Sequence, residues 1–347
     1  MQTMPVGLID GERTLTIHER PVPEPTAATV VVDIAHCGIC GTDVHAWESG
    51  RLLSPAVCGH EWAGTVSAVG RDVTTVAEGE RVVVAVPPAC GRCDPCLAGH
   101  ADYCNDVLLT QLGADALAPE HGGFAPSLRV GPGRVVKADP GLSDAEAAQI
   151  EPATVTYHAV ARSGLRPGAT AVVQGGGPIG LTTLQWVRAA GAGHVIVIEP
   201  SPSRQDLARS LGADDVVGPG AEAEALVKER TRGLGADAVY ECVGRPDTVQ
   251  IAVDLVRRGG SVCIIGLAGG DVSITPTTWL IKEVTVTAAL AYLHHEFETV
   301  MGMVADGRVR LEPLHDHTIG LADLDAAMAE LASGASPHTK ILVDPRS

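Results

Sequence analysis

The stretch TAVVQGGGPIGLTTLQWVRAAG, residues 170–191, decides the fold of this chain. It opens with a short apolar run typical of a buried strand and continues into the glycine pattern G-x-G-x-x-G at residues 175–180. A helical pattern follows, with Pro178 in its first turn and Gly191 near its end. A second apolar run, HVIVIE at 194–199, comes next. The order of strand, glycine turn, helix and strand predicts a βαβ unit.

The glycine turn predicts a dinucleotide site. Without side chains in the way, a pyrophosphate can approach the backbone, and the free N–H groups at the helix N-terminus attract its charge. Glu199 follows Gly180 by 19 residues, where it can accept hydrogen bonds from the adenosine ribose hydroxyls and repel a 2′-phosphate. NAD is therefore expected rather than NADP, although Arg204 could accommodate that phosphate; a nucleotide-free α/β domain is the alternative. The expected cofactor-binding residues are Gly175, Gly177, Pro178, Ile179, Gly180, Glu199 and Arg204.

The pattern of predicted strands and helices differs between the parts of the chain on either side of this unit. Residues 156–290 alternate strand and helix patterns, including an expected helix over 246–260, and predict a doubly wound parallel sheet. Residues 1–155 read as short β-rich segments broken by Gly and Pro, which indicates an irregular antiparallel barrel or sandwich. Residues 291–347 are too few to fold alone and are expected to complete the first domain, with His315 and His317 in a loop. The expected fold class is α/β.

Composition excludes several classes of partner. The 347 residues are 45% hydrophobic and 19% charged, which fits a folded protein with a sizeable core. The formal net charge of −17 opposes binding to nucleic acid or to an anionic membrane. No apolar run reaches the roughly 18 residues of a membrane span, and the first residues do not resemble a signal peptide. We expect a cytoplasmic protein, in which the nine cysteines are thiols or metal ligands.

Four of these cysteines form the pattern C-x2-C-x2-C-x7-C within ACGRCDPCLAGHADYC. Four thiolates so close together satisfy a tetrahedral Zn²⁺ and leave no open position. The similar ferredoxin pattern has only three residues before its last cysteine and needs a second cluster, for which the sequence offers no motif. The pattern predicts a structural zinc held by Cys90, Cys93, Cys96 and Cys104.

A second set of metal-ligating residues lies earlier in the chain. The segments CGTDVH at 40–45 and GHEWAG at 59–64 supply a thiolate, an imidazole and a carboxylate in Cys40, His60 and Glu61. Three such ligands leave one position open on Zn²⁺, as in catalytic zinc sites. Each residue also has a plainer interpretation, Cys40 as a buried thiol and His60 as a turn histidine. Their occurrence beside a four-cysteine lobe and a dinucleotide loop favours the catalytic site.

Together these motifs make the chain resemble the zinc-dependent medium-chain alcohol dehydrogenases, in the order CGTDVH, GHEWAG, four-cysteine lobe and GGGPIG. The resemblance covers essentially the whole chain. It implies a GroES-like catalytic domain over 1–155, a Rossmann NAD-binding domain over 156–290, and a C-terminal segment over 291–347 that completes the catalytic domain. It further implies an NAD-dependent oxidoreductase with two zinc ions per chain, one catalytic and one structural.

The resemblance also assigns site residues. Cys40 and His60 would bind the catalytic zinc, and Glu61 would bind it or exchange with water. The segment IEPATVTYHA resembles the polyol and butanediol dehydrogenase branch, which makes Glu151 a further ligand, direct or through water. Thr42 and His45 match the family's proton relay, from the substrate hydroxyl through the nicotinamide ribose to solvent. Asp43 is expected to orient His60.

The substrate is expected to be a small secondary alcohol, diol or cyclitol, or the matching ketone. Sorbitol-type members carry an arginine just before an aromatic residue near the pocket, where this chain has Ala291 before Tyr292. The alternatives are a zinc-free quinone or enoyl reductase on the same scaffold and a non-catalytic NAD-binding zinc protein. The resemblance also implies a homo-oligomer, a tetramer or dimer, paired through edge strands of the cofactor domain.

Overall fold

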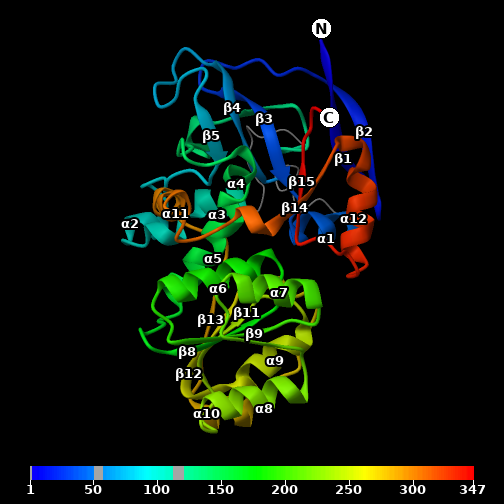
Figure 1. The fold of residues 1–347 in the computed structure, drawn as a ribbon. Helices are drawn as coiled ribbons and strands as arrows, with labels where there is room; N and C mark the ends of the chain where they lie inside the picture. Colours follow the sequence, from blue (N-terminus) through cyan, green and yellow to red (C-terminus); the bar gives the residue numbers. More distant parts are fainter. Residues whose placement is uncertain (1, 51–57, 112–120) are drawn as a thin grey trace. The chain divides into compact units, whose positions relative to one another are not determined.

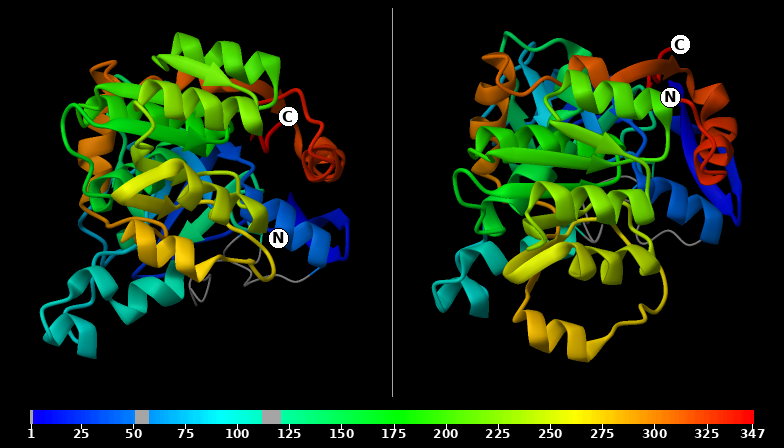
Figure 2. Two further views of the ribbon diagram at one scale, coloured as in Figure 1. Left: turned by 90° about the horizontal axis from the view of Figure 1, so that it is seen from below. Right: turned by 60° about the horizontal axis from the view of Figure 1, so that its bottom comes forward.

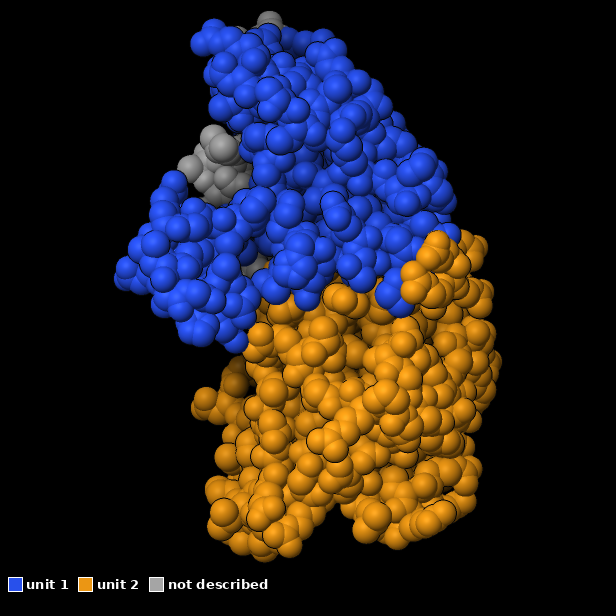
Figure 3. Space-filling view, turned by 90° about the vertical axis from the view of Figure 1, so that its left-hand side faces the viewer, with its two compact units in different colours: residues 1–151, 293–305, 315–347 blue, residues 152–292, 306–314 orange. Residues whose placement is uncertain are grey.

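The computed structural model describes residues 2–50, 58–111 and 121–347. The chain divides into two compact units, drawn in different colours in Figure 3. Unit 1 comprises residues 1–151, 293–305 and 315–347, and unit 2 comprises residues 152–292 and 306–314. Among the described helices, none has the length and apolar composition of a membrane span.

Unit 1 is built on a mostly antiparallel sheet with the strand order β14-β15-β3-β4-β5-β7, in which β6 also pairs with β3 (Figure 1). A separate hairpin joins β1 to β2. The strands are β1 (Thr3–Gly11), β2 (Thr14–Pro21), β3 (Val30–Gly38), β4 (Glu61–Val69), β5 (Arg81–Val84), β6 (Ser127–Val130), β7 (Val135–Lys137), β14 (His315–Ile319) and β15 (Lys340–Val343). The helices are α1 (Gly41–Ser49), α2 (Asp94–Leu97), α3 (Asn105–Gln111), α4 (Asp144–Ala148), α11 (Glu296–Ala305) and α12 (Leu324–Ala332).

The core of unit 1 explains why the end of the chain belongs to it. The β-branched run of β3 alternates its side chains across the sheet and buries Val30, Val32 and Ile34 completely. Leu324 and Met328 of α12 are fully buried in the same cluster. The last helix therefore closes the core that the first 150 residues begin.

Unit 2 is a parallel sheet with the strand order β10-β9-β8-β11-β12-β13. Its strands are β8 (Thr170–Gln174), β9 (His194–Ile198), β10 (Asp215–Val217), β11 (Ala236–Glu241), β12 (Val256–Ile264) and β13 (Thr285–Ala288). The helices of this half of the chain are α5 (Ile150–Arg162), α6 (Pro178–Ala189), α7 (Pro202–Ser210), α8 (Ala221–Arg230), α9 (Pro246–Leu255) and α10 (Pro276–Lys282). Figure 1 shows α6 and α7 on one face of this sheet and α9 and α10 on the other. The expected α/β class with a doubly wound parallel sheet is confirmed.

The division into units differs from the expected boundaries at 155/156 and 290/291. The units meet in sequence between Glu151 and Pro152 and between Tyr292 and Leu293, and residues 306–314 return to unit 2. This return has a local cause, since the Arg310 backbone N–H donates to Gln185 Oε1 at 2.7 Å and Gln185 Nε2 donates to the Arg310 carbonyl at 3.0 Å.

Two local predictions are wrong. The helix expected over 246–260 ends at Leu255, because Val256 is extended and begins β12. Lys282 of α10 reinforces this end by donating to the carbonyl oxygens of Val253, Asp254 and Val256, each at 2.7 Å.

The second wrong prediction concerns His315 and His317, which lie in a strand rather than a loop. Their segment, β14, pairs in parallel with β15. Sequence alternation could not identify this strand, because its ladder partner β15 lies about 25 residues further along the chain.

An ion cluster at the edge strand β10 yields a stability prediction. Asp215 accepts hydrogen bonds from Arg230 Nε at 2.7 Å and Arg230 Nη2 at 3.0 Å, and lies 2.7 Å from His194 Nε2. Arg230, followed by His194, lowers the pKa of Asp215 to about 2. A depressed carboxyl pKa stabilises the fold above the unfolded pKa of about 4, and this stabilisation is lost as pH falls toward about 2.

Asp215→Asn should therefore lower the melting temperature at pH 7 by about 2–5 °C, since a partly exposed pair of this kind contributes about 1–2 kcal/mol. The difference from wild type should narrow below about pH 4. Asp206→Asn, which breaks the exposed pair with Arg209 (2.8 Å), is the matched control and should shift the melting temperature by less than about 1 °C. Equal shifts for the two variants would contradict the assignment.

Candidate metal sites and nucleotide pocket

The register of β3 against β4 brings the first candidate metal site together. The two strands are antiparallel, and Gly38 lies opposite Glu61. Cys40 follows the end of β3 and His60 precedes the start of β4, so both extend from the same end of the ladder. The ligand atoms of Cys40, His60 and Glu61 all lie within 4.8 Å of one another. Among the described residues, this is one of two groups that could hold a metal ion.

Asp43 fixes the backbone of this group. Its fully buried carboxylate accepts hydrogen bonds from the backbone N–H groups of Cys40 at 2.8 Å and Gly59 at 3.0 Å. Oδ1 of Asp43 also lies 3.7 Å from Nδ1 of His60, an ion-pair distance rather than a hydrogen bond. Asp43 thus holds the chain on both sides of the site, and its expected role of orienting His60 stays a prediction.

The electrostatics of the group fit a cation. Burial raises the pKa of Asp43 to about 6, although the charge of His60 lowers it. Burial alone would lower the pKa of His60. The negative charges of Cys40 and Asp43 raise it by more than burial lowers it, so the pKa of His60 lies well above its usual value. An imidazole that is drawn toward its cationic form marks a strongly anionic pocket. A divalent cation bound by the thiolate and the carboxylate would compensate this charge.

Glu151 lies at the start of α5 and is buried, with 7% of its surface exposed. Its charge acts on His60, but it lies outside the group of three whose ligand atoms meet. Glu61 is thus the carboxylate that the structure places with Cys40 and His60, and a role for Glu151 as a zinc ligand stays a prediction.

Thr42 and His45 lie on α1, one turn apart. The Cys40 thiol donates to Thr42 Oγ1 at 3.7 Å, so this hydroxyl adjoins the candidate site. The His45 side chain is 51% exposed, with Nδ1 3.6 Å from a Glu48 carboxylate oxygen. One group thus lies beside the candidate ligands and the other reaches solvent, as a proton relay would require.

One buried residue of the site escaped the sequence analysis. Lys340, the first residue of β15, forms an ion pair with Glu61, and both side chains are nearly inaccessible to solvent. Lys340 Nζ also donates to the carbonyl oxygen of Ile39 at 3.0 Å. A lysine at the head of the apolar strand KILV was the available signal, since a charge there must find a buried partner.

The second group of ligands is the four-cysteine lobe. Cys90, Cys93, Cys96 and Cys104 come together within 4.8 Å. Figure 2 shows the lobe, in cyan, projecting from the strands of unit 1. Backbone N–H groups of Cys93 and Arg92 donate to the Cys90 sulfur at 3.4 and 3.5 Å.

Backbone hydrogen bonds from Cys96 and Asn105 lower the pKa of Cys93 to about 6. Backbone N–H groups that point at sulfur favour the thiolate form that binds metal. The four-cysteine lobe therefore fits a closed tetrahedral zinc site.

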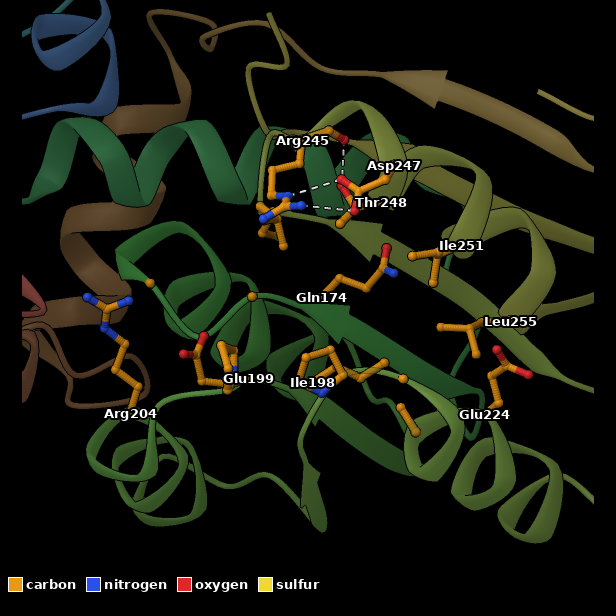
Figure 4. A pocket seen from close by; sticks show the side chains of 18 residues that line it. Gln174, Ile198, Glu199, Arg204, Glu224, Arg245, Asp247, Thr248, Ile251 and Leu255 are labelled. Atoms are coloured by element: carbon orange, nitrogen blue, oxygen red, sulfur yellow. Dashed lines mark hydrogen bonds and ion pairs between the residues drawn. The ribbon is translucent and has the colours of Figure 1, made fainter. Parts of the chain in front are cut away.

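A pocket of about 470 Å³ lies in unit 2 at the carboxyl ends of β8, β9 and β11 (Figure 4). The strand order reverses between β8 and β11, which is where doubly wound sheets bind ligands. Its charged lining residues are Glu199, Arg204, Glu224, Arg245 and Asp247. Figure 4 shows Glu199 and Arg204 on the same side of the pocket, and Arg245 paired with Asp247 on another wall.

The glycine loop requires its glycines for different reasons. Gly175 has a φ of +95°, which side chains disfavour. A Cβ on Gly180 would overlap the Gly175 carbonyl oxygen, so helix α6 could not pack against the strand. A Cβ on Gly177 would meet nothing within 4 Å, which leaves open space at the N-terminus of α6. This space is where a pyrophosphate can approach.

Glu199 closes the loop from the neighbouring strand. Its buried carboxylate accepts hydrogen bonds from the backbone N–H groups of Gly176 at 2.6 Å and Ser201 at 2.9 Å. Pro178 and Ile179 form the first turn of α6 as expected, although among the described lining residues neither is part of the pocket wall. The cofactor roles of the individual loop residues stay predictions.

Comparisons with known proteins agree with this architecture. Residues 26–140 match the model of the alcohol dehydrogenase GroES-like domain, and residues 178–306 match that of the zinc-binding dehydrogenases. The chain is 36% identical to the sorbitol dehydrogenase of Bacillus subtilis (strain 168) over 77% of this chain and 76% of that protein.

Solved structures show the same fold. The 2R,3R-butanediol dehydrogenase of Bacillus subtilis is 28% identical with a TM-score of 0.84, covering 99% of both chains. A protein of Sinorhizobium meliloti 1021, described as a zinc-binding dehydrogenase and solved with NADP, is 29% identical with a TM-score of 0.87, covering 99% of this chain and 100% of the other.

The fold and the two matching family models identify a zinc-binding dehydrogenase. The chain belongs to the zinc-dependent medium-chain alcohol dehydrogenase family, as the sequence motifs predicted. It is an oxidoreductase that acts on CH–OH groups.

The lobe yields a metal-content prediction. Cys93→Ser should remove about one equivalent of zinc per chain and lower the melting temperature of unit 1, because metal binding there is coupled to folding. Arg92→Ala, which changes an exposed neighbour in the same loop, should retain both properties. Elemental analysis and calorimetry measure the two quantities. Wild-type zinc content and stability in Cys93→Ser would show that the lobe is not a metal site.

The glycine loop yields a second prediction. Gly180→Ala should lower the melting temperature of unit 2, because its Cβ collides with backbone. Gly177→Ala should keep the wild-type melting temperature but weaken NAD(H) binding at least about tenfold, because its Cβ points into the space left for pyrophosphate. Calorimetry and fluorescence titration with NADH separate the two effects. Wild-type NADH affinity in Gly177→Ala would place the dinucleotide elsewhere.

Proposed function

We propose that this protein is an NAD-dependent dehydrogenase that transfers hydride between a small secondary alcohol, diol or cyclitol, or the matching ketone, and NAD(H). The observation that carries the proposal is the meeting of Cys40, His60 and Glu61 in unit 1. The substrate class also draws on the relatives, which include a sorbitol dehydrogenase and a butanediol dehydrogenase.

The alternatives fit less well. A zinc-free quinone or enoyl reductase on this scaffold needs no metal ligands, whereas a thiolate, an imidazole and a carboxylate meet here. A non-catalytic NAD-binding zinc protein needs no proton relay. Here a hydroxyl lies beside the candidate metal ligands, and a solvent-exposed histidine follows one turn further along α1.

In the proposed assignment unit 1 is the catalytic domain and unit 2 the cofactor domain. Two zinc ions are expected per chain, one structural and one catalytic. Cys40, His60 and a carboxylate would hold the catalytic ion, which would act as a Lewis acid toward a carbonyl or alcohol oxygen.

Thr42 and His45 transfer the proton of the substrate hydroxyl in this proposal. Thr42 Oγ1 can accept the proton of the substrate hydroxyl and donate its own, because a hydroxyl is donor and acceptor at once. His45, half exposed, is the group that exchanges this proton with solvent, because an imidazole can both accept and donate a proton. Asp43 holds the backbone on which Cys40 and His60 are mounted.

The proposed preference for NAD rests on pocket charge. Three carboxylates and two guanidinium groups line the pocket, and Arg245 is already paired with Asp247. A 2′-phosphate would lie near the buried carboxylate of Glu199 and would be repelled by it. Arg204 is the residue that could offset this repulsion, so NADP is the weaker candidate.

The protein is proposed to form a homo-oligomer, a dimer or a tetramer, and to reside in the cytoplasm. Strand β13 ends the sheet of unit 2, and Leu280, Ile281 and Leu290 nearby in sequence are at least 60% exposed. An edge strand beside exposed apolar side chains favours pairing with a second copy. The nine cysteines stand outside disulfides, as thiols or candidate metal ligands, which favours a reducing compartment.

An activity screen tests the proposal. Zinc-loaded protein should oxidise or reduce members of a panel of diols, cyclitols, amino alcohols and ketones, with a higher kcat/KM for NAD(H) than for NADP(H). Cys40→Ala should lower kcat/KM by about 1,000-fold or more, because the metal contributes several kcal/mol to the reaction. Cys37→Ala, a buried thiol at the end of β3, should stay within about threefold of wild type. The proposal fails if no panel member reacts, or if the two variants behave alike.

A further inference from the structure

Lys340 is a buried cation that shares an anion with the candidate metal site. Only 3% of its side chain is exposed, and Nζ donates to the Glu61 carboxylate and to the Ile39 carbonyl oxygen. A buried ammonium group without an anionic partner is strongly unfavourable, so Glu61 is needed to hold this charge in the core. Glu61 is also one of the three residues whose ligand atoms meet.

The strands are arranged to keep this pair together. β3 lies between β4, which carries Glu61, and β15, which carries Lys340 (Figure 1). Gly38 of β3 lies between the two side chains, where a Cβ would overlap Glu61 Oε2 and come within 2.9 Å of Lys340 Cε. Glycine at position 38 thus leaves the space that the ion pair occupies.

The Lys340 ammonium is held on two oxygen acceptors, because the Glu61 carboxylate is its ion-pair partner and the Ile39 carbonyl oxygen accepts its second hydrogen bond. A fixed positive charge here acts on a metal ion in two ways. It repels the ion directly, and it competes for the carboxylate that the ion would use.

We propose that Lys340 is a positioning residue that holds back the Glu61 carboxylate and thereby keeps the metal bound by Cys40 and His60 exchangeable. Glu61 is then a shared group, with its charge divided between the ammonium and the metal. The metal keeps more of its positive charge than a full thiolate–carboxylate ligand set would leave it. This inference rests on the catalytic zinc of the proposed function.

Zinc release in the absence of substrate and NAD(H) tests the inference. The probe is transfer of Zn²⁺ from the purified protein to a chromophoric chelator such as 4-(2-pyridylazo)resorcinol. The phase that disappears in Cys40→Ala belongs to this site, which separates it from the four-cysteine lobe. Lys340→Met should slow that phase by about tenfold or more, within the range seen for residues that contact metal ligands. Lys340→Arg, which keeps the cation, should remain within about threefold of wild type.

The direction of the effect separates positioning from mere structural support. Damage to the fold would speed zinc release, whereas loss of the competing cation slows it. An unchanged or faster phase in a folded Lys340→Met protein overturns the inference.

A second variant keeps the test decisive if Lys340→Met does not fold. Gly38→Ala keeps both charges but drives Glu61 and Lys340 apart, and both colliding groups are ends of flexible side chains. It should slow the same phase by about threefold or more. Gly41→Ala, whose Cβ meets nothing within 4 Å, is the matched control and should leave release unchanged. Equal rates in Gly38→Ala and Gly41→Ala overturn the inference, whatever the outcome of the dehydrogenase screen.

Discussion

The antiparallel pairing of β3 with β4 is the constraint on which the metal site depends. With Gly38 opposite Glu61, the residues just beyond the ladder on each strand, Cys40 and His60, come together although about 20 residues separate them in sequence. A slip of one residue would turn Glu61 to the other face of the sheet and separate it from its partners. The third strand, β15, brings Lys340 to the same place from the far end of the chain. The donor set is therefore a consequence of sheet register more than of any local motif.

The nucleotide site in unit 2 follows a different principle. There the parallel strands β8, β9 and β11 end at one edge, and the glycine loop needs only local conformations that are encoded in consecutive residues. Gly175 supplies the turn, Gly180 the close contact of helix and strand, and Gly177 the open approach to the helix N-terminus. Each unit thus carries one part of the proposed chemistry: activation of oxygen in unit 1 and binding of the hydride carrier in unit 2.

This difference explains what the sequence could predict. The parallel sheet, the glycine loop and the four-cysteine lobe are encoded in short segments with fixed spacing, and the structure contains each of them. The grouping of Cys40, His60 and Glu61 was predicted through motifs whose spacing carries no geometric information by itself. Lys340 was missed, because its partner lies 279 residues away and its significance appears only when β15 is placed beside β3. The strand β14 and the early end of α9 were missed for a related reason, since a distant strand and the side chain of Lys282 determine them.

A metal ion where β3 and β4 bring Cys40 and His60 together is the central requirement of the proposed chemistry. Anomalous diffraction at the zinc absorption edge tests for this ion most directly. Crystals of the wild-type protein should show two anomalous peaks per chain. One should lie among the four sulfur atoms of the lobe. The other should lie about 2.3 Å from the sulfur of Cys40 and about 2.0–2.1 Å from a ring nitrogen of His60. A map with no peak between Cys40 and His60 would contradict the account.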